Sequence, residues 1–160
     1  MLSTYLLLGN ACLDVPGLKW VDLDKGQLDN PDKFNSLIPP ALLIGQTDLT
    51  WSQLAGRNQL GKGTVTTKTV LTLPTATHIS HPTAQDNLAK LTIADRVRAT
   101  ILSVPGVMSR LTTREYSSGS FFVVEETFEV AFKSGPSYNY VSLTPHVTAF
   151  MSTSTNPPTA

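Results

Sequence analysis

The tripeptide Val-Pro-Gly occurs twice in the sequence, each time where a helical pattern gives way to an alternating one. The two copies are Val15-Pro16-Gly17 and Val104-Pro105-Gly106. Proline lacks the backbone N–H that a helix interior requires, and glycine permits the sharp turn that follows. Both stops therefore predict a helix that ends directly in front of a strand.

The segment before each stop has helical periodicity. Thr83-Ala84-Gln85-Asp86 resembles a capping box and opens the longer helix. Its apolar stripe is Leu88, Leu91, Ala94, Val97, Ile101 and Val104. The N-terminal helix is expected from about Ser3 to Leu13, with a stripe of Leu2, Leu6, Gly9 and Leu13. No basic residue precedes this apolar run, so we expect a helix of the mature protein, with Cys12 buried in it.

Strand patterns fill most of the remaining chain. They cover Leu18–Leu23, Ala41–Ile44, Thr64–Leu73, and a hairpin of Val107–Tyr116 and Phe121–Phe132. The predicted order is α-β-β-β-α-β-β. The simplest arrangement is an α+β fold in which two helices pack on one face of a mainly antiparallel sheet.

Residues 1–133 are expected to form one domain, since a chain of 160 residues fits a single core. Ser134-Gly135-Pro136 breaks the last strand. Residues 134–150 are then a C-terminal arm or edge strand, either buried in its own domain or added to a neighbouring copy. Residues 151–160 are expected to be disordered.

Two connections have the composition of functional loops. Asp24–Pro40 is long and polar, and Ser52–Gly63 contains three glycines and one arginine, which predicts a flexible excursion between strands. We expect both to be mobile in the free subunit and to contact neighbouring proteins in an assembly.

Charge and composition narrow the classes of partner. Twelve basic residues balance twelve acidic ones, which gives no general attraction to nucleic acid or to a membrane surface. No apolar run reaches the length of a membrane span. The charged fraction is only 15%, and a surface rich in Thr and Ser costs little to desolvate against a protein partner.

The motifs that look chemical are incomplete. Gly56–Lys62 has the spacing of a phosphate-binding loop, but a predicted strand follows it where such a loop requires a helix. His78 and His81 lack a third metal ligand nearby, and no Gly-x-Ser-x-Gly motif frames a serine. The acidic residues Glu125, Glu126 and Glu129 alternate between faces, which favours a solvated strand or a partner's basic groove. The sequence therefore predicts a protein that is not an enzyme and holds no cofactor or metal.

The layout resembles that of the tail terminator (tail completion) proteins of long-tailed bacteriophages. The segments that carry the resemblance are Leu13–Leu18, Pro40–Ile44, Thr64–Leu73 and Leu102–Val107. It implies six copies that form a ring, cap the tail tube and present a docking surface to the head or neck. The implied partners are the chain itself, a tail tube protein and a head or neck connector protein, in a virion assembled in the host cytoplasm.

The candidate interaction residues lie in or beside the two loops and in the C-terminal segment. They are Asp29, Lys33, Phe34, Trp51, Arg57, Lys62, Tyr138 and Tyr140. Two other interpretations stay open. One is another portal–tail connector or neck ring protein, and the other is a monomeric α+β domain that binds a ligand or RNA on its sheet.

Overall fold

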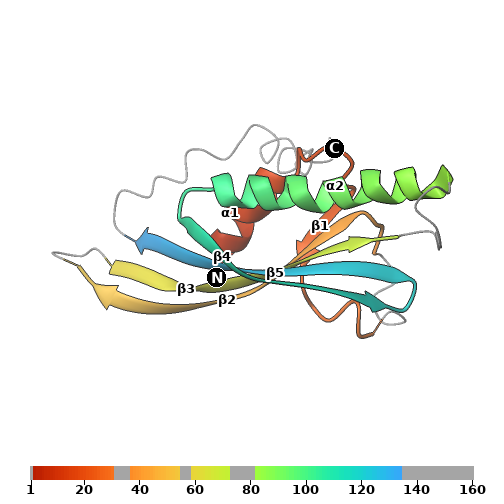
Figure 1. The fold of residues 1–160 in the computed structure, drawn as a ribbon. Coiled ribbons are helices and arrows are strands. Elements are labelled where there is room, and N and C mark those ends of the chain that lie inside the picture. The colour runs from red at the N-terminus through yellow and green to blue at the C-terminus, as the bar shows by residue number, and fades with distance from the viewer. Residues whose placement is uncertain (1, 31–36, 55–58, 73–81, 135–160) are drawn as a thin grey trace, which may run out of the picture.

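Two helices lie next to each other on one face of a mixed, mostly antiparallel sheet (Figure 1). The computed structural model describes residues 2–30, 37–54, 59–72 and 82–134. The predicted α+β class is confirmed. The helices are α1 (Leu2–Cys12) and α2 (Pro82–Ser103). The strands are β1 (Trp20–Leu23), β2 (Ala41–Gln53), β3 (Gln59–Leu71), β4 (Val107–Ser118) and β5 (Phe121–Ser134).

The strands lie in the order β1-β2-β3-β5-β4. β1 is parallel to β2, and the other neighbouring strands are antiparallel. α2 joins β3 to β4 along the chain. In the β4–β5 hairpin, β5 is the strand that lies next to β3. That hairpin turns at Gly119 and Ser120, where Gly119 has a φ of 58°, as a two-residue turn of this kind requires.

Both Val-Pro-Gly stops adopt the same local structure. In the first, Val15 N–H donates to the Cys12 carbonyl at 3.1 Å, and Leu18 N–H donates to the Val15 carbonyl at 3.1 Å. The second repeats this pattern from Val104 to Ile101 and from Val107 to Val104, at 3.0 Å each. The glycines, Gly17 and Gly106, have φ values of 89° and 98°, a left-handed conformation that other residues rarely adopt. The shared tripeptide thus ends both helices by one mechanism.

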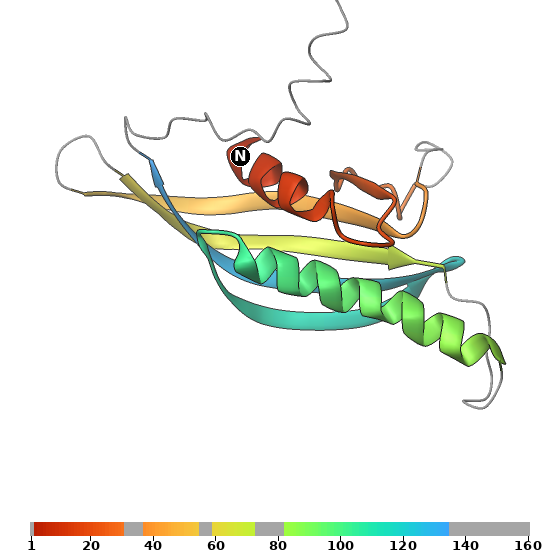
Figure 2. The same cartoon turned by 90° about the horizontal axis from the view of Figure 1, so that it is seen from above.

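The main core lies between the helices and the sheet. α1 lies over β1 and β2, whereas α2 lies over β3 and β4 (Figure 2). The fully buried side chains of this core are Leu8, Cys12, Leu42, Ile44, Val65, Leu71, Val97, Ile101, Phe128 and Val130. Burial raises the pKa of the Cys12 thiol to about 12, so the thiol is neutral at physiological pH. Cys12 is therefore a small core residue, as the sequence predicted.

On the opposite face of the sheet, the described residues form a second, smaller hydrophobic cluster at one end. Ala41, Leu43 and Val70 are buried there under Trp20, Leu28, Leu37 and Phe121. Leu28 and Leu37 belong to the connection between β1 and β2, so part of the predicted polar loop packs against the sheet. Apart from the buried Val123, which pairs with Val70, the described side chains on the rest of this face are mainly polar.

The predicted helix stripes are partly wrong at their ends. In α1 the buried positions are Thr4, Leu8, Gly9 and Cys12, so Gly9 of the predicted stripe is confirmed, while Leu13 is 56% exposed because it follows the last helical residue. In α2 the stripe is buried from Ala94 to Val104, but Leu88 is 56% exposed. The sequence pattern could not show that the first turns of α2 extend beyond the strands (Figure 2).

The prediction of a flexible excursion at Ser52–Gly63 is wrong for the residues that are described. β2 continues to Gln53 and β3 begins at Gln59, so most of this segment is antiparallel ladder. The glycines allow the backbones of β2 and β3 to lie close together. A Cβ at Gly63 would overlap the Asp48 carbonyl oxygen, and one at Gly61 would lie 2.9 Å from the Trp51 ring. Glycine here permits tight pairing of the strands.

The core assignment of α2 predicts unequal effects of truncation along the helix. Ile101→Ala should lower the free energy of unfolding by about 2–5 kcal/mol, because a buried side chain is replaced by a cavity. Leu88→Ala should change it by less than about 0.5 kcal/mol, since that side chain is exposed. Chemical denaturation measures both, and equal effects would contradict the assignment.

Substitution of a glycine in the β2–β3 ladder should have the opposite effect on stability from substitution of the glycine in α1. Gly63→Ala should destabilise the fold, because its Cβ would meet backbone of β2. Gly9→Ala should stabilise it by about 0.5–1 kcal/mol, since alanine is the better helix former and its Cβ would make ordinary contacts at 3.7 and 3.9 Å. Thermal unfolding of the two variants tests this pair, and a stable Gly63→Ala protein would show that the strands are not closely paired.

Candidate interaction surfaces

The two edges of the sheet differ in structure. β1 pairs only with Ala41–Ile44 of β2. Beyond a bulge at Gly45 and Gln46, the outer side of β2 from Thr47 to Ser52 has no neighbouring strand in the described part of the chain. We call these six residues the β2 edge. It carries one charged residue, Asp48, and no proline.

The edge formed by β4 is irregular. Its register against β5 shifts twice, between Val107 and Ser109 and between Arg110 and Thr112. Each bulge inserts one extra residue, Met108 and Leu111 respectively. Arg114 and Glu115 add charge farther along the strand. Bulges and charges are the devices by which proteins discourage pairing at a sheet edge, so β4 is a protected edge.

Among the nine exposed large apolar side chains of the described residues, five lie toward opposite edges of the sheet, and we treat them as two groups. Trp51 and Leu54, at the far end of β2, are 46% and 38% exposed. We call them the hairpin group. Leu102, Met108 and Leu111 are 40%, 64% and 51% exposed and form the α2–β4 group. β3 and β5 lie between the two groups, a separation of about 14 Å at the usual strand spacing.

The ring of Trp51 packs against the glycine opposite it. Its ring lies across Gly61, its partner in the ladder, and Gly61 in turn pairs with Phe132 of β5. A side chain at Gly61 would displace the indole. Trp51 is therefore a fixed aromatic side chain at the edge of the molecule, with nearly half of its surface open to a partner.

A buried carboxylate links α2 to the protected edge. Glu126 of β5 is 1% exposed and lies on the helix side of the sheet. Its Oε1 accepts hydrogen bonds from Arg98 Nε at 2.5 Å, Arg110 Nη1 at 3.3 Å and Thr113 Oγ1 at 3.2 Å. The expectation that Glu126 belongs to a solvated acidic face is wrong, because arginines from α2 and β4 neutralise and cover it.

The groups around Arg98 favour its charged form. Burial alone would lower the pKa of Arg98, but its hydrogen bond to Glu126 and the charges of Glu126 and Asp95 outweigh that effect and raise it. Asp95 holds the outer side of the guanidinium at 2.6 Å. The cluster is therefore a structural tie between helix and edge strand.

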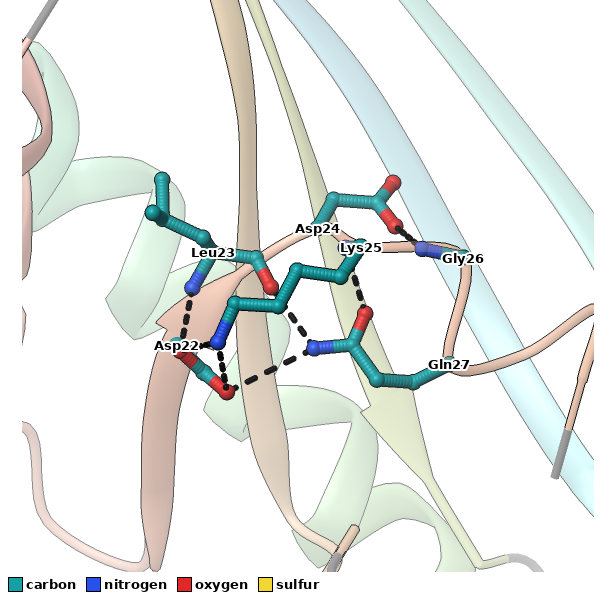
Figure 3. A network of polar contacts seen from close by, with 6 residues as sticks. All are labelled: Asp22, Leu23, Asp24, Lys25, Gly26 and Gln27. Atoms are coloured by element: carbon teal, nitrogen blue, oxygen red, sulfur yellow. Dashed lines mark hydrogen bonds and ion pairs between the residues drawn. The ribbon is translucent and has the colours of Figure 1, made fainter. Parts of the chain in front are cut away.

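A self-contained polar turn follows β1 (Figure 3). The side chain of Gln27 donates to the Leu23 carbonyl at 2.6 Å and accepts from Lys25 N–H at 2.7 Å. Asp24 accepts from Gly26 N–H at 3.0 Å. Asp24 also pairs with Lys68 of β3 at 2.7 Å, which fixes the turn to the sheet. The start of the predicted polar loop is thus an ordered turn.

The polar part of the face opposite the helices is made of mutually paired groups. Tyr116 donates to Glu125 at 3.2 Å, and Arg114 lies over the Tyr116 ring at 5.2 Å. Thr66 and Thr127 share a hydrogen bond of 3.2 Å across the central strands. Burial raises the pKa of Tyr116, and the Glu125 charge raises it further. Among the described residues, this face shows neither the stacked, exposed aromatic side chains nor the basic excess of an RNA platform.

The structure locates three of the eight candidate interaction residues. Asp29 ends the polar turn and is exposed, Trp51 belongs to the hairpin group, and Lys62 is exposed on β3. Lys62 lies in a strand, so the sequence that resembles a phosphate-binding loop runs into a ladder. The remaining candidates, Lys33, Phe34, Arg57, Tyr138 and Tyr140, lie outside the described residues, as do His78 and His81.

Sequence reasoning missed the α2–β4 group. Met108 and Leu111 lie in a predicted strand, and the sequence pattern does not show that each is the extra residue of a bulge in an edge strand. Within the described ranges, no group of three or more His, Cys, Asp or Glu side chains is placed to hold a metal ion. No helix in the described part of the chain is long and apolar enough to cross a membrane. No protein-family model matches the chain, and no curated protein matches it.

The buried cluster predicts different effects for two neighbouring glutamates. Glu126→Gln should lower the free energy of unfolding by about 1–3 kcal/mol, because the arginines lose the carboxylate that compensates them. Glu129→Gln should change it by less than about 0.5 kcal/mol, since Glu129 is exposed and contacts only Ser109 among the described residues, at 3.2 Å. Denaturant titration measures both, and a neutral Glu126→Gln would show that the cluster does not support the fold.

Proposed function

We propose that this chain is a structural, non-enzymatic subunit of the tail-terminator type. Six copies form a ring that caps a tail tube and joins it to the head or neck. The order of the described elements, α-β-β-β-α-β-β, is the order on which the resemblance to that family is based, and it supports the proposal. Both Val-Pro-Gly stops end a helix in front of a strand, which is the layout on which the resemblance is based.

The observation that carries the proposal is the pair of exposed apolar groups. A ring needs a heterologous interface, in which one patch of a subunit meets a different patch of the next. The hairpin group and the α2–β4 group are different surfaces, and β3 and β5 separate them. Contact between the two groups of adjacent copies would repeat around a ring and leave neither of them exposed.

The polar groups of the chain also fit a structural function. The glutamate that looked like part of an acidic cluster is held by Arg98 and Arg110. The Lys68 ammonium pairs with Asp24, and its pKa is raised because this hydrogen bond and charge outweigh the opposing effect of burial. The charges of Glu126 and Lys68 are thus compensated within the subunit, which is typical of groups that support a fold.

The proposal predicts that assembly depends on the α2–β4 group. Wild-type protein should form particles with a mass near six times the 17.3 kDa of one chain, visible as rings by negative stain. Leu111→Glu should reduce this assembly at least tenfold, because a charge would be buried in the interface. Light scattering over a concentration series, with and without tail tubes from the same particle, measures the assembled fraction.

Leu13→Glu is the matched control. Leu13 is 56% exposed and Leu111 is 51% exposed, and Leu13 lies outside both apolar groups. The control should assemble like the wild type, and both variants should keep the wild-type melting temperature. A protein that stays monomeric at all concentrations and on tube ends would contradict the proposal. Equal loss of assembly in both variants would contradict the assignment of the interface.

A further inference from the structure

β4 contains two extra residues relative to β5, and contacts at both ends of the bulged stretch fix that number. At one end, Ala131 N–H donates to the Gly106 carbonyl at 2.7 Å, directly after the second Val-Pro-Gly stop. At the other end, Thr112 pairs with Thr127, and from there the register continues without a shift to the hairpin turn. The extra residues must therefore lie before Thr112, but these anchors do not decide which residues they are.

The bulge at Leu111 changes which side chains of β4 reach the helix side of the sheet. Arg110 pairs with the buried Phe128, and Thr113 pairs with Glu126, so both lie on the helix side because paired residues share a face. Residues three apart face opposite sides in a regular strand. The extra residue between Arg110 and Thr113 is what brings both of them to Glu126.

A different placement of the same extra residue is compatible with both anchors. If the register of the hairpin continued by two more residues, Leu111 would pair with Phe128 and Arg110 would pair with Glu129. Ser109 would then be the extra residue in place of Leu111. Burial of a leucine and a cross-strand pair of opposite charges both favour this alternative. The structure nevertheless has the bulge at Leu111, so another interaction outweighs them.

The buried carboxylate of Glu126 supplies that interaction. Glu126 is 1% exposed, and its Oε1 accepts from Arg98 Nε at 2.5 Å and from Arg110 Nη1 at 3.3 Å. In the alternative register Arg110 would lie on the opposite face, and the carboxylate would lose one of its two arginines. Removing a partner from a buried ion pair costs more than leaving one leucine exposed.

We infer that Glu126, acting through Arg110, sets the register of β4 and thereby places Leu111 on the surface. Glu126 is in this respect a positioning residue for the α2–β4 group. Met108 is an extra residue in both registers, so Leu111 is the member of β4 whose exposure depends on the carboxylate. The use of this group as a subunit contact rests on the proposed function, whereas the register is a property of the single chain.

The rate of thiol labelling of Leu111→Cys measures the register. The side chain at this position is 51% exposed in the structure, and it would lie against Phe128 in the core in the alternative register. Burial raises the pKa of the natural Cys12 thiol to about 12, so that thiol reacts little at neutral pH. Addition of Glu126→Gln should slow the labelling at least tenfold. The measurement uses dilute monomer, because the proposed ring would cover the same position.

The direction of the change separates positioning from a loss of stability. A variant that only destabilises the fold opens more often, so its buried thiols, Cys12 included, label faster. A change of register slows the labelling of Leu111→Cys alone. Met108→Cys is the matched control, since Met108 is 64% exposed and is extra in both registers. Its labelling rate should stay within twofold when Glu126→Gln is added.

The two arginines provide a second matched pair, because each contributes one cation to the same carboxylate. Arg110→Gln removes the side chain that holds the register, so it should slow the labelling of Leu111→Cys at least tenfold. Arg98→Gln leaves Arg110 as the remaining arginine on Glu126, and the rate should stay within twofold of the parent. The Arg110 side chain is 41% exposed, so this pair decides the question if Glu126→Gln does not fold.

The outcomes separate this inference from the proposed function. Unchanged labelling of Leu111→Cys with Arg110→Gln would overturn the register inference, as would equal slowing with Arg98→Gln, and neither result bears on whether wild-type rings form. Slow labelling in the variants of a protein that never forms rings would support the register and contradict the proposed function. Slow labelling together with loss of assembly in Arg110→Gln, but not in Arg98→Gln, would support both.

Discussion

The pairing of β3 with β5 is the interaction on which the rest of the structure depends. Its register runs without interruption from Gln59 opposite Ser134 to Leu71 opposite Phe122, and it joins two hairpins that are far apart in the sequence. α2 lies between these hairpins along the chain and packs across the sheet that they form. Without this ladder Phe128 and Val130 would lose their contacts with Val65, and the helices would have no continuous surface to cover.

Local sequence signals predicted the helices and strands. The order of the strands and the exposure of single side chains depend on longer-range contacts, which these signals do not describe. Val-Pro-Gly fixed both helix ends because proline and glycine act on their own backbone. The order of the strands depends on which hairpin meets which, and no local pattern carries that information. Gly61 and Gly63 led to the wrong prediction of a flexible segment, because glycine occurs both in flexible turns and where strands pack closely. The candidate surfaces were predicted only in part, since Met108 and Leu111 are the extra residues at two bulges in the pairing of β4 with β5, and no local pattern shows where a bulge falls.

Glu126 shows how a polar residue can specify a position in an apolar layer. It shares the core face of β5 with Val124 and Phe128, where a simple alternation would place a hydrophobic residue. Its carboxylate requires two arginines and a threonine at defined places on α2 and β4. Buried ionic groups add little net stability, but they exclude arrangements that leave the charge unpaired. The helix and the edge strand are thereby held in one relative position.

The two edges of the sheet differ in regularity, so the two sides of the molecule are not equivalent. A subunit with two open edges could stack without limit, as strands do in fibrils. Here the bulges of β4 interrupt one side of the ladder, whereas among the described strands the outer sides of β1 and of β2 from Thr47 to Ser52 have no neighbouring strand. On the β4 side, the bulges and the charges of Arg110 and Arg114 therefore act against backbone pairing between copies, which protects a Thr-rich, weakly charged sheet from aggregation along that edge.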